Sequence, residues 1–316
     1  WTGILATSPE LQTGGTRGLF HGFFNDSDTN RTVDYVQIST TGNALDFGDM
    51  NSNAQFYGGA TSSRTLSYYV GGQNMGGSNS NQIQYFTMSS TGNGTDYGDL
   101  TTAVTYSNSG ASNGTRGLSG GGGFTGGANS NIIEYFALQT SGSGQDFGDL
   151  TAAQFSGPGV ACSKTRSIFT SNAGPSASNY KYMDYVQTAT LGNASDFGDQ
   201  SQGFGHHAQG IASNAVRGVL VSSYYAPAKV NTVEYVTIAT LGDSVDFGDL
   251  TQVRIMSGAA ASSTRLVVSN GRTDGPGYVN TIDYAQIMTT GNFIDFGDST
   301  VGSDMRPGAS NGHGGL

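Results

Sequence analysis

The residues of this chain that could do chemistry are mostly carboxylates, and they recur at one spacing. The tetrapeptide Asp-aromatic-Gly-Asp occurs six times and ends at Asp49, Asp99, Asp149, Asp199, Asp249 and Asp298. Successive copies therefore lie 50, 50, 50, 50 and 49 residues apart. Paired carboxylates can hold a metal ion or transfer protons. An active site needs such a pair only once, so the sixfold recurrence favours a structural role.

The letters Asp-Phe-Gly within this motif also occur in protein kinases, where the aspartate holds magnesium beside the nucleotide. Six copies, without a glycine-rich phosphate loop or a catalytic-loop motif, exclude that interpretation. We expect the aspartates to bind turn amides or a recurring arginine, because a guanidinium can hold a carboxylate bidentately. The predicted structural clasp comprises Arg17, Arg64, Arg116, Arg166, Arg217 and Arg265 with Asp46, Asp49, Asp96, Asp99, Asp146, Asp149, Asp196, Asp199, Asp246, Asp249, Asp295 and Asp298.

Few other residues are candidates for chemistry. Five more acids each precede a recurring tyrosine: Asp34, Glu134, Asp184, Glu234 and Asp283. The adjacent His206 and His207 would point to opposite faces of a strand, which makes a poor metal pair. Residues 25–28 begin like a calcium loop but lack the glutamate that such loops carry downstream. Cys162 is the only cysteine, so it forms no disulfide within this chain. We therefore expect no catalytic residue, metal or cofactor.

The elements that position these residues repeat about every 50 residues, which is the signature of a repeat fold. In the third copy, residues 133–138 alternate around Tyr135 with the period of two that is typical of a half-buried strand. The distance from this tyrosine to the last aspartate is 14 residues in every copy, and a glycine-containing turn lies between them. This pattern predicts a rigid hairpin, with insertions confined to loops outside it. A weakly patterned fourth strand is predicted after each motif, for example at 101–106 or 253–256.

Four short antiparallel strands per copy and no helical periodicity predict an all-β fold, a six-bladed β-propeller. The alternative is a parallel β-solenoid, whose coils are usually shorter. We expect one domain over 1–316, with repeats at approximately 14–50, 51–100, 101–150, 151–200, 201–250 and 251–298. Segments 1–13 and 299–316 would close the ring or link it to more chain.

Closure of the ring has two interpretations. Residues 4–7 are predicted to pair as the outer strand of the blade that contains Tyr284. Alternatively, Ser310–Leu316 echoes Ser112–Leu118 and would begin a degenerate seventh unit. Either arrangement hides strand edges that an open ring would expose.

The composition restricts the partners. The chain has 13 Lys and Arg against 23 Asp and Glu, with a formal net charge of −10. This balance argues against nucleic acid, because phosphates require clustered cations. A membrane span needs about 20 consecutive apolar residues, and the sequence has no such run.

The unit resembles the kelch repeat in its arginine, in the paired glycines of Val70-Gly71-Gly72 and Gly120-Gly121, and in the acid before the tyrosine. The resemblance implies kelch-like four-stranded blades, although Phe or Tyr stands where kelch blades usually carry Trp. The detailed pattern of the unit is Thr-Arg-Gly, then Ile/Val-Glu/Asp-Tyr-Val, then Thr-Gly-Asn-Ala-x-Asp-Phe-Gly-Asp-Leu. This pattern is similar to repeats encoded in marine bacteriophages. There they occur in virion structural or tail-fibre proteins, and the similarity covers residues 14–298 approximately.

These resemblances imply a non-enzymatic virion structural or surface-binding module, of the phage tail-fibre, receptor-binding or capsid-decoration type. It would lie on the virion surface or be extracellular. Its partners would be other virion proteins or a host cell-surface glycan or receptor, and oligomerisation stays open. One alternative is an extracellular carbohydrate-binding lectin or adhesin that uses Tyr180, Tyr182, Tyr224 and Tyr225. The other is a glycan-active propeller enzyme, which needs carboxylates or a histidine converging at the central channel.

Overall fold

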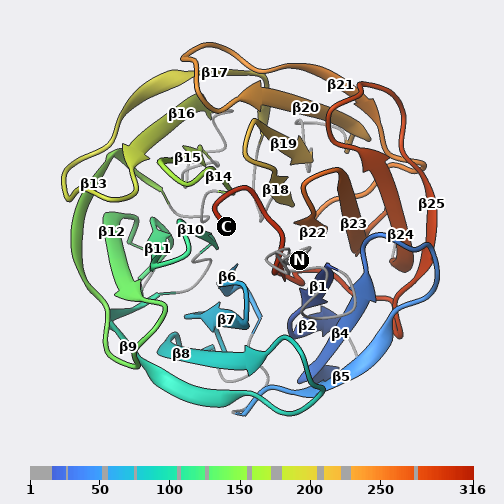
Figure 1. The fold of residues 1–316 in the computed structure, drawn as a ribbon, viewed down its shortest axis with the longest axis horizontal. Helices are drawn as coiled ribbons and strands as arrows, with labels where there is room; N and C mark the ends of the chain where they lie inside the picture. The colour runs from blue at the N-terminus through green and yellow to red at the C-terminus, as the bar shows by residue number, and fades with distance from the viewer. Residues whose placement is uncertain are drawn as a thin grey trace, which may run out of the picture.

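Six four-stranded sheets surround a central axis in the computed structural model (Figure 1). The structure describes residues 16–25, 28–51, 56–74, 77–104, 108–124, 128–154, 159–171, 180–204, 210–221, 229–273 and 277–316. Neighbouring strands within each blade are antiparallel. The chain is therefore an all-β, six-bladed propeller, as the repeat predicts. No helix that could cross a membrane occurs in these described ranges.

The blades are numbered in chain order, and their strands are given from the channel outward. Blade 1 is β26 (Gly308–Ser310), β1 (Arg17–Phe20), β4 (Thr32–Gln37) and β5 (Leu45–Asp49); blade 2 is β6 (Gly59–Ser62), β7 (Leu66–Val70), β8 (Ser80–Thr87) and β9 (Thr95–Val104). Blade 3 is β10 (Asn108–Ser112), β11 (Arg116–Gly120), β12 (Ser130–Ala137) and β13 (Gln145–Gln154); blade 4 is β14 (Val160–Cys162), β15 (Arg166–Thr170), β16 (Tyr180–Gln187) and β17 (Ser195–Phe204). Blade 5 is β18 (Ile211–Ser213), β19 (Arg217–Val221), β20 (Thr232–Thr237) and β21 (Val245–Asp249); blade 6 is β22 (Gly258–Ala261), β23 (Arg265–Arg272), β24 (Tyr278–Gln286) and β25 (Ile294–Asp298). A small extra hairpin joins β2 (Phe23–Asn25) to β3 (Asp28–Asn30).

The predicted rigid hairpin is the outer half of every blade. Its turn has the same length in all six, at 38–44, 88–94, 138–144, 188–194, 238–244 and 287–293. The pairing register shifts by one residue opposite the Asp-aromatic-Gly-Asp motif in each blade, for example between Val33 and Asp34. Such a bulge bends the outer strand and re-aims its side chains.

The fourth strand of each blade does not lie where the sequence pattern placed it. It is the innermost strand and comes just before the recurring arginine, as β10 does, whereas residues 101–104 continue the outer strand β9. Residues 253–256 belong to no strand. The inner strands consist largely of Gly, Ala and Ser because they converge on the axis. A Cβ on Gly110, for instance, would overlap Thr61 of the neighbouring blade. Strands so small lack the apolar alternation by which a strand is recognised.

The ring closes through the end of the described chain. Strand β26 pairs with β1, with Ser310 opposite Gly18 and Ala309 opposite Leu19. The same dipeptide, Ala-Ser, ends the inner strand of blade 3 as Ala111-Ser112. The interpretation of Ser310–Leu316 as the start of a degenerate seventh unit is therefore wrong, because Ser310 ends the innermost strand of blade 1 and residues 311–316 belong to no strand. The pairing predicted for residues 4–7 lies outside the described residues, and the four strands of the blade containing Tyr284 all come from 258–298.

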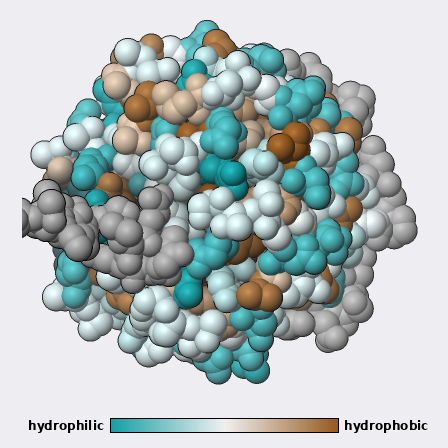
Figure 2. All heavy atoms as spheres, turned by 45° about the vertical axis from the view of Figure 1, so that its right-hand side comes forward, coloured by the Kyte–Doolittle hydropathy of each residue, from teal (hydrophilic) through white to brown (hydrophobic). Residues whose placement is uncertain are grey.

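The hydrophobic core lies between the blades. The cluster that contains Leu19 and Phe47 of blade 1 also contains Phe86 and Met88 of blade 2, and five further clusters join the other neighbouring blades in the same way. The rings of Phe47 and Phe86 are 6.3 Å apart. Each motif aromatic therefore packs between neighbouring blades. On the face drawn in Figure 2, hydrophobic side chains are scattered among hydrophilic and near-neutral ones.

Candidate functional site

The acids that precede the recurring tyrosine are buried and join neighbouring blades. Asp184 in β16 accepts hydrogen bonds from the backbone N–H and the hydroxyl of Thr151, which follows the motif of blade 3, both at 2.8 Å. Thr251 binds Asp283 in the same way across the seam between blades 5 and 6. The full set of acceptors is Asp34, Gln84, Glu134, Asp184, Glu234 and Asp283. These side chains support the scaffold, as the sequence indicates.

Burial dominates the electrostatics of two of these acids. It raises the pKa of Glu134 and of Asp184, and the hydrogen bonds from Thr101 and Thr151 oppose the rise. Two of the acids also form fully buried ion pairs, Asp283 with Arg254 at 3.1 Å and Asp34 with Arg306 at 2.8 Å. Arg306 comes from the segment that closes the ring, so its ion pair ties that segment to blade 1.

The recurring arginines bind neighbouring blades, but through backbone carbonyls. Arg166 Nη1 donates to the carbonyl of Ile238 in blade 5 at 2.8 Å, and its guanidinium lies 4.6 Å from the ring centre of Tyr185. The equivalent hydrogen bonds join Arg17 to Met88, Arg116 to Thr188, Arg217 to Ile287 and Arg265 to Ile38. These five arginines form no ion pair with a motif aspartate in the described part of the chain. The predicted aspartate partner is thus wrong. Each arginine begins the second strand whereas the aspartates stand on the fourth, two strand spacings or roughly 10 Å away.

Arg64 was assigned to this set by sequence spacing, and that assignment is also wrong. Leu66 occupies the equivalent place, because it pairs with Thr87 as Arg116 pairs with Ala137. Arg64 lies in the turn before it. In blade 2 the Tyr68 hydroxyl donates instead to the next blade, to the carbonyl of Leu138 at 2.6 Å. The irregular spacing of 47 and 52 residues on either side of Arg64 was the available signal.

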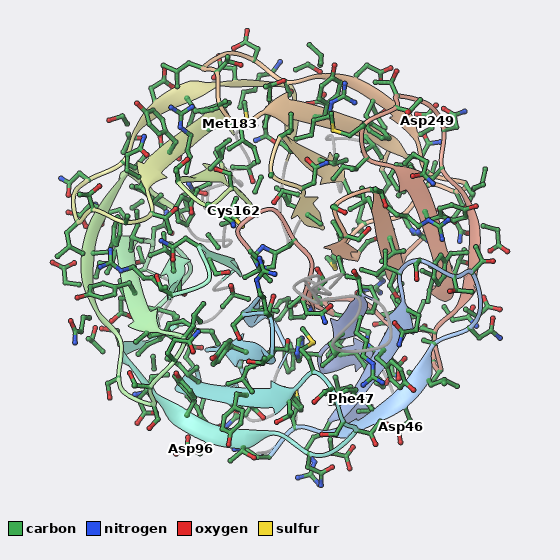
Figure 3. The ribbon with its side chains drawn as sticks, viewed as in Figure 1. Asp46, Phe47, Asp96, Cys162, Met183 and Asp249 are labelled. Carbon is green, nitrogen blue, oxygen red and sulfur yellow. The ribbon has the colours of Figure 1, made fainter. Side chains whose placement is uncertain are left out.

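The motif aspartates stand at the outer rim, where Figure 3 shows Asp46, Asp96 and Asp249. The first aspartate of each copy is exposed, and the second is exposed or half-buried. Asp46 accepts a hydrogen bond from the N–H of Gly48 at 3.1 Å, so its partner is a backbone amide of the same strand, β5. The motif joins blades mainly through its backbone, since the N–H of Gly92 donates to the carbonyl of Phe47 at 2.8 Å.

The motif glycine is needed at this seam. Gly48 has φ +144°, and a Cβ there would overlap the carbonyl of Gly92 in the next blade. The same approach recurs at the equivalent seams, including Gly297 against Gly42 between blades 6 and 1. The glycine therefore allows two backbones to meet, as its position in a tight motif predicts.

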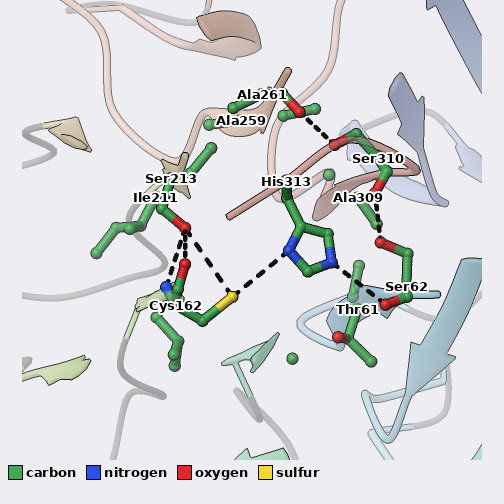
Figure 4. A pocket seen from close by; sticks show the side chains of 16 residues that line it. Thr61, Ser62, Cys162, Ile211, Ser213, Ala259, Ala261, Ala309, Ser310 and His313 are labelled. Carbon is green, nitrogen blue, oxygen red and sulfur yellow. Dashed lines mark hydrogen bonds between the residues drawn. The ribbon is translucent and has the colours of Figure 1, made fainter. Parts of the chain in front are cut away.

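The channel contains a polar pair that the sequence analysis did not assemble. The last residues of β6, β10, β14, β18 and β26 are Ser62, Ser112, Cys162, Ser213 and Ser310. Serine hydroxyls donate around the axis, from Ser112 to the carbonyl of Ser62 at 2.7 Å and from Ser213 to that of Cys162 at 2.8 Å. His313, which follows β26, lies over this ring with Nδ1 3.6 Å from the Cys162 sulfur (Figure 4).

Several predicted residues lie outside the described part of the chain. These are His206, His207, Tyr224, Tyr225, Asp26 and the side chain of Tyr180. Among the described residues, no group of three or more His, Cys, Asp or Glu side chains is arranged to hold a metal ion. No protein-family model matches the sequence, and the search of curated proteins finds no match. The fold and the interblade contacts define the chain as a six-bladed β-propeller.

Proposed function

We propose that this propeller is a non-enzymatic binding or assembly module, of the kind found on phage virions as tail-fibre, receptor-binding or decoration proteins. The two faces of the ring support the proposal. Because the strands are antiparallel, inner turns and outer hairpin turns leave from one face, and all other connections leave from the opposite face. We name these the short-turn face and the loop face.

The short-turn face is uniform, whereas the loop face varies between blades. Inner turns have three residues at 63–65, 113–115, 163–165, 214–216 and 262–264, and outer turns have seven. Toward the loop face, the outer strands β9, β13 and β17 extend over ten residues, whereas β5, β21 and β25 extend over five, and blade 1 carries the additional β2–β3 hairpin. Scaffolds that recognise partners commonly concentrate such variation on one rigidly supported surface. This difference between the faces is the observation that carries the proposal.

A cluster of aromatic side chains on the loop face adds to this support, with Phe24 and Tyr278 half-buried and Phe56 buried. The rings of Phe24 and Phe56 lie 5.2 Å apart, and those of Phe24 and Tyr278 lie 6.4 Å apart. Tyr57 beside them has φ +61°, a conformation that is uncommon for a residue with a side chain. Strained backbone of this kind is found disproportionately at ligand-binding sites. Partner contacts are therefore assigned to the loop face.

The test combines immunogold labelling of particles of the encoding phage with a printed glycan array probed by the purified protein. We expect label on the virion, and any glycan binding to fall at least tenfold in Tyr278→Ala. Leu241→Ala, which removes an exposed side chain from the short-turn face, should bind as the wild type does. Particles without label would contradict the virion assignment, and array binding by such a protein would support the lectin alternative. Turnover of array glycans would overturn the non-enzymatic assignment.

A further inference from the structure

The thiol of Cys162 occupies a position that serine fills elsewhere in the same ring. Ser62, Ser112, Ser213 and Ser310 end their inner strands at the equivalent register, and their hydroxyls donate to neighbouring carbonyls. The scaffold therefore does not require a sulfur atom here. His313 faces two members of this set: its Nε2 lies 3.1 Å from the Ser112 hydroxyl, and its Nδ1 lies 3.6 Å from the sulfur of Cys162, which is 151 positions away in the chain.

His313 is held with one ring nitrogen turned toward the sulfur. Its Nε2 lies 3.1 Å from the Ser112 hydroxyl and 3.2 Å from the carbonyl of Ser62. The Ser112 hydroxyl donates its one proton to that carbonyl, so both oxygens face Nε2 as acceptors and Nε2 carries a proton. Nδ1 is then the unprotonated nitrogen, and the N–H of Gly315 donates to it at 3.1 Å. The same lone pair faces the Cys162 sulfur at 3.6 Å. The imidazole is thus oriented to take the thiol proton.

The tail that carries His313 fits the channel closely. The N–H of Gly314 donates to the carbonyl of Ser213 at 2.8 Å. A Cβ on Gly314 would overlap the carbonyl of Asn214, and one on Gly315 would overlap that of Ser112. The position of the imidazole is consequently set by backbone packing on both sides.

Electrostatics shift both pKa values of this pair in the direction of its charged form. Burial by itself would raise the pKa of the Cys162 thiol, but the charge and hydrogen bond of His313 outweigh it and lower that pKa. Burial likewise opposes protonation of His313, whereas the thiolate raises its pKa overall. A thiolate, unlike a thiol, is the nucleophilic form of cysteine.

A small cavity adjoins the sulfur. Its volume is about 40 Å³, and Cys162, Ser213, His313 and Thr61 are among the residues that line it (Figure 4). One water needs roughly 10–15 Å³ of such space, so the cavity admits a molecule of two heavy atoms and excludes bulky reagents. Thr61 is 2% exposed, and no hydrogen-bond partner for its hydroxyl is found among the described residues. A small polar ligand would satisfy that hydroxyl.

We propose that Cys162 is a modification site for hydrogen peroxide, with His313 as its proton acceptor and Thr61 as a hydrogen-bond partner of the oxidant. The thiol proton moves to Nδ1, and the thiolate attacks one peroxide oxygen. A sulfur–oxygen bond forms as the oxygen–oxygen bond breaks, and the leaving hydroxide takes the proton from Nδ1 to become water. The products are a sulfenic acid, one water and neutral His313. Sulfur is oxidised by two electrons and peroxide is reduced by two.

Oxidation would also act on closure of the ring. The added oxygen lies in the cavity beside the sulfur, and the thiol hydrogen that faced Nδ1 across 3.6 Å is no longer present on the sulfur. The tail that follows β26 would then lose one of its anchors in the channel.

The experiment follows the intact mass of the protein during treatment with hydrogen peroxide, with the sulfenic acid trapped by a cyclic dione during unfolding. We expect one dione adduct on the wild type and none on Cys162→Ser, a readout that oxidation of exposed methionines such as Met288 does not affect. His313→Gln should slow the reaction at least tenfold, and folded protein should resist N-ethylmaleimide because the cavity is too small. The thermal midpoint should fall on oxidation of the wild type only.

The pH profile of the rate keeps the proposal falsifiable if His313→Gln does not fold. In the urea-unfolded chain, the rate should rise toward the ordinary thiol pKa of about 8.5. In the folded wild type it should reach its plateau at lower pH. A folded protein that reacts no faster than the unfolded chain at pH 7 would overturn the proposal, as would a folded His313→Gln with the wild-type rate.

Discussion

His21 should make closure of the propeller sensitive to mild acid. This residue is fully buried after β1, where its Nδ1 lies 3.2 Å from the carbonyl of Pro307 and its Nε2 lies 2.9 Å from the hydroxyl of Ser67. It thus touches blade 1, blade 2 and the closing segment. Burial lowers the pKa of His21 from 6.5 to about 4; the hydrogen bond to Pro307 opposes this shift, and the charge of Arg306 adds to it.

The size of the effect follows from this difference in pKa. The unfolded chain binds a proton at His21 below about pH 6.5, while the folded chain does so only near pH 4. The contribution of the neutral histidine to stability is complete above pH 6.5. It declines as the pH falls toward 4 and is constant below. At about 1.4 kcal/mol for each unit, the loss is about 3 kcal/mol. For a chain of this length, that corresponds to roughly 5 °C in the thermal midpoint.

The assay measures the free energy of unfolding of the wild type and of His21→Asn at several pH values between 7.5 and 4. Asparagine retains a donor for the Pro307 carbonyl but does not titrate, so its packing defect should cost the same at every pH. Buried acids such as Glu134 and Asp184 titrate in both proteins and cancel in the difference. We expect the difference in free energy of unfolding between wild type and His21→Asn to decrease by about 3 kcal/mol as the pH falls from 7.5 to 4. A difference that is independent of pH would refute the reasoning.

Three further predictions test the seams between blades by thermal or urea unfolding. Gly248→Ala should destabilise the protein by about 1–3 kcal/mol more than Gly291→Ala. Both glycines have positive φ, at 143° and 150°, but only a Cβ on Gly248 meets a neighbouring carbonyl. Equal losses of stability would contradict the close backbone contact at this seam. Arg166→Met should lower the free energy of unfolding by about 2 kcal/mol, because the hydrogen bond to Ile238 and the contact with the Tyr185 ring are lost. The control Lys181→Met, at an exposed position, should lower it by about 0.5 kcal/mol. Similar values for both variants would show that the arginine does not stabilise the scaffold. Deletion of 308–316 should lower the thermal midpoint and cause association, because β1 loses its partner; an unchanged, monodisperse monomer would show that β26 is dispensable.

Local patterns predicted the parts of the fold that depend on neighbouring residues. The alternation around Tyr135 and the constant distance to Asp149 identified the outer hairpin, because strand pairing across a short turn is decided within that stretch. The same patterns assigned the inner strands wrongly. Strands such as β22, with the sequence Gly-Ala-Ala-Ala, carry no alternation, and their small side chains are required only by other blades near the axis.

The candidate site was harder to predict, because its contacts join distant parts of the chain. The repeat identified an acid before five of the tyrosines, but it could not assign Thr151 as the partner of Asp184. It paired the arginines with aspartates on charge alone. A charged partner is not obligatory for a guanidinium, which also binds carbonyls and aromatic rings.

The amino-acid sequence by itself determined the number of blades, the hairpin in each and the glycine at each seam, since these follow from a period, a turn length and a motif repeated in one chain. Only the tertiary structure decided that β26 completes blade 1, that arginines bind carbonyls across the seams, and that His313 meets Cys162 in the channel. The physical reason is that a closed ring brings together residues from the beginning, middle and end of the described chain. Their proximity depends on the curvature of all six blades, which no local pattern records.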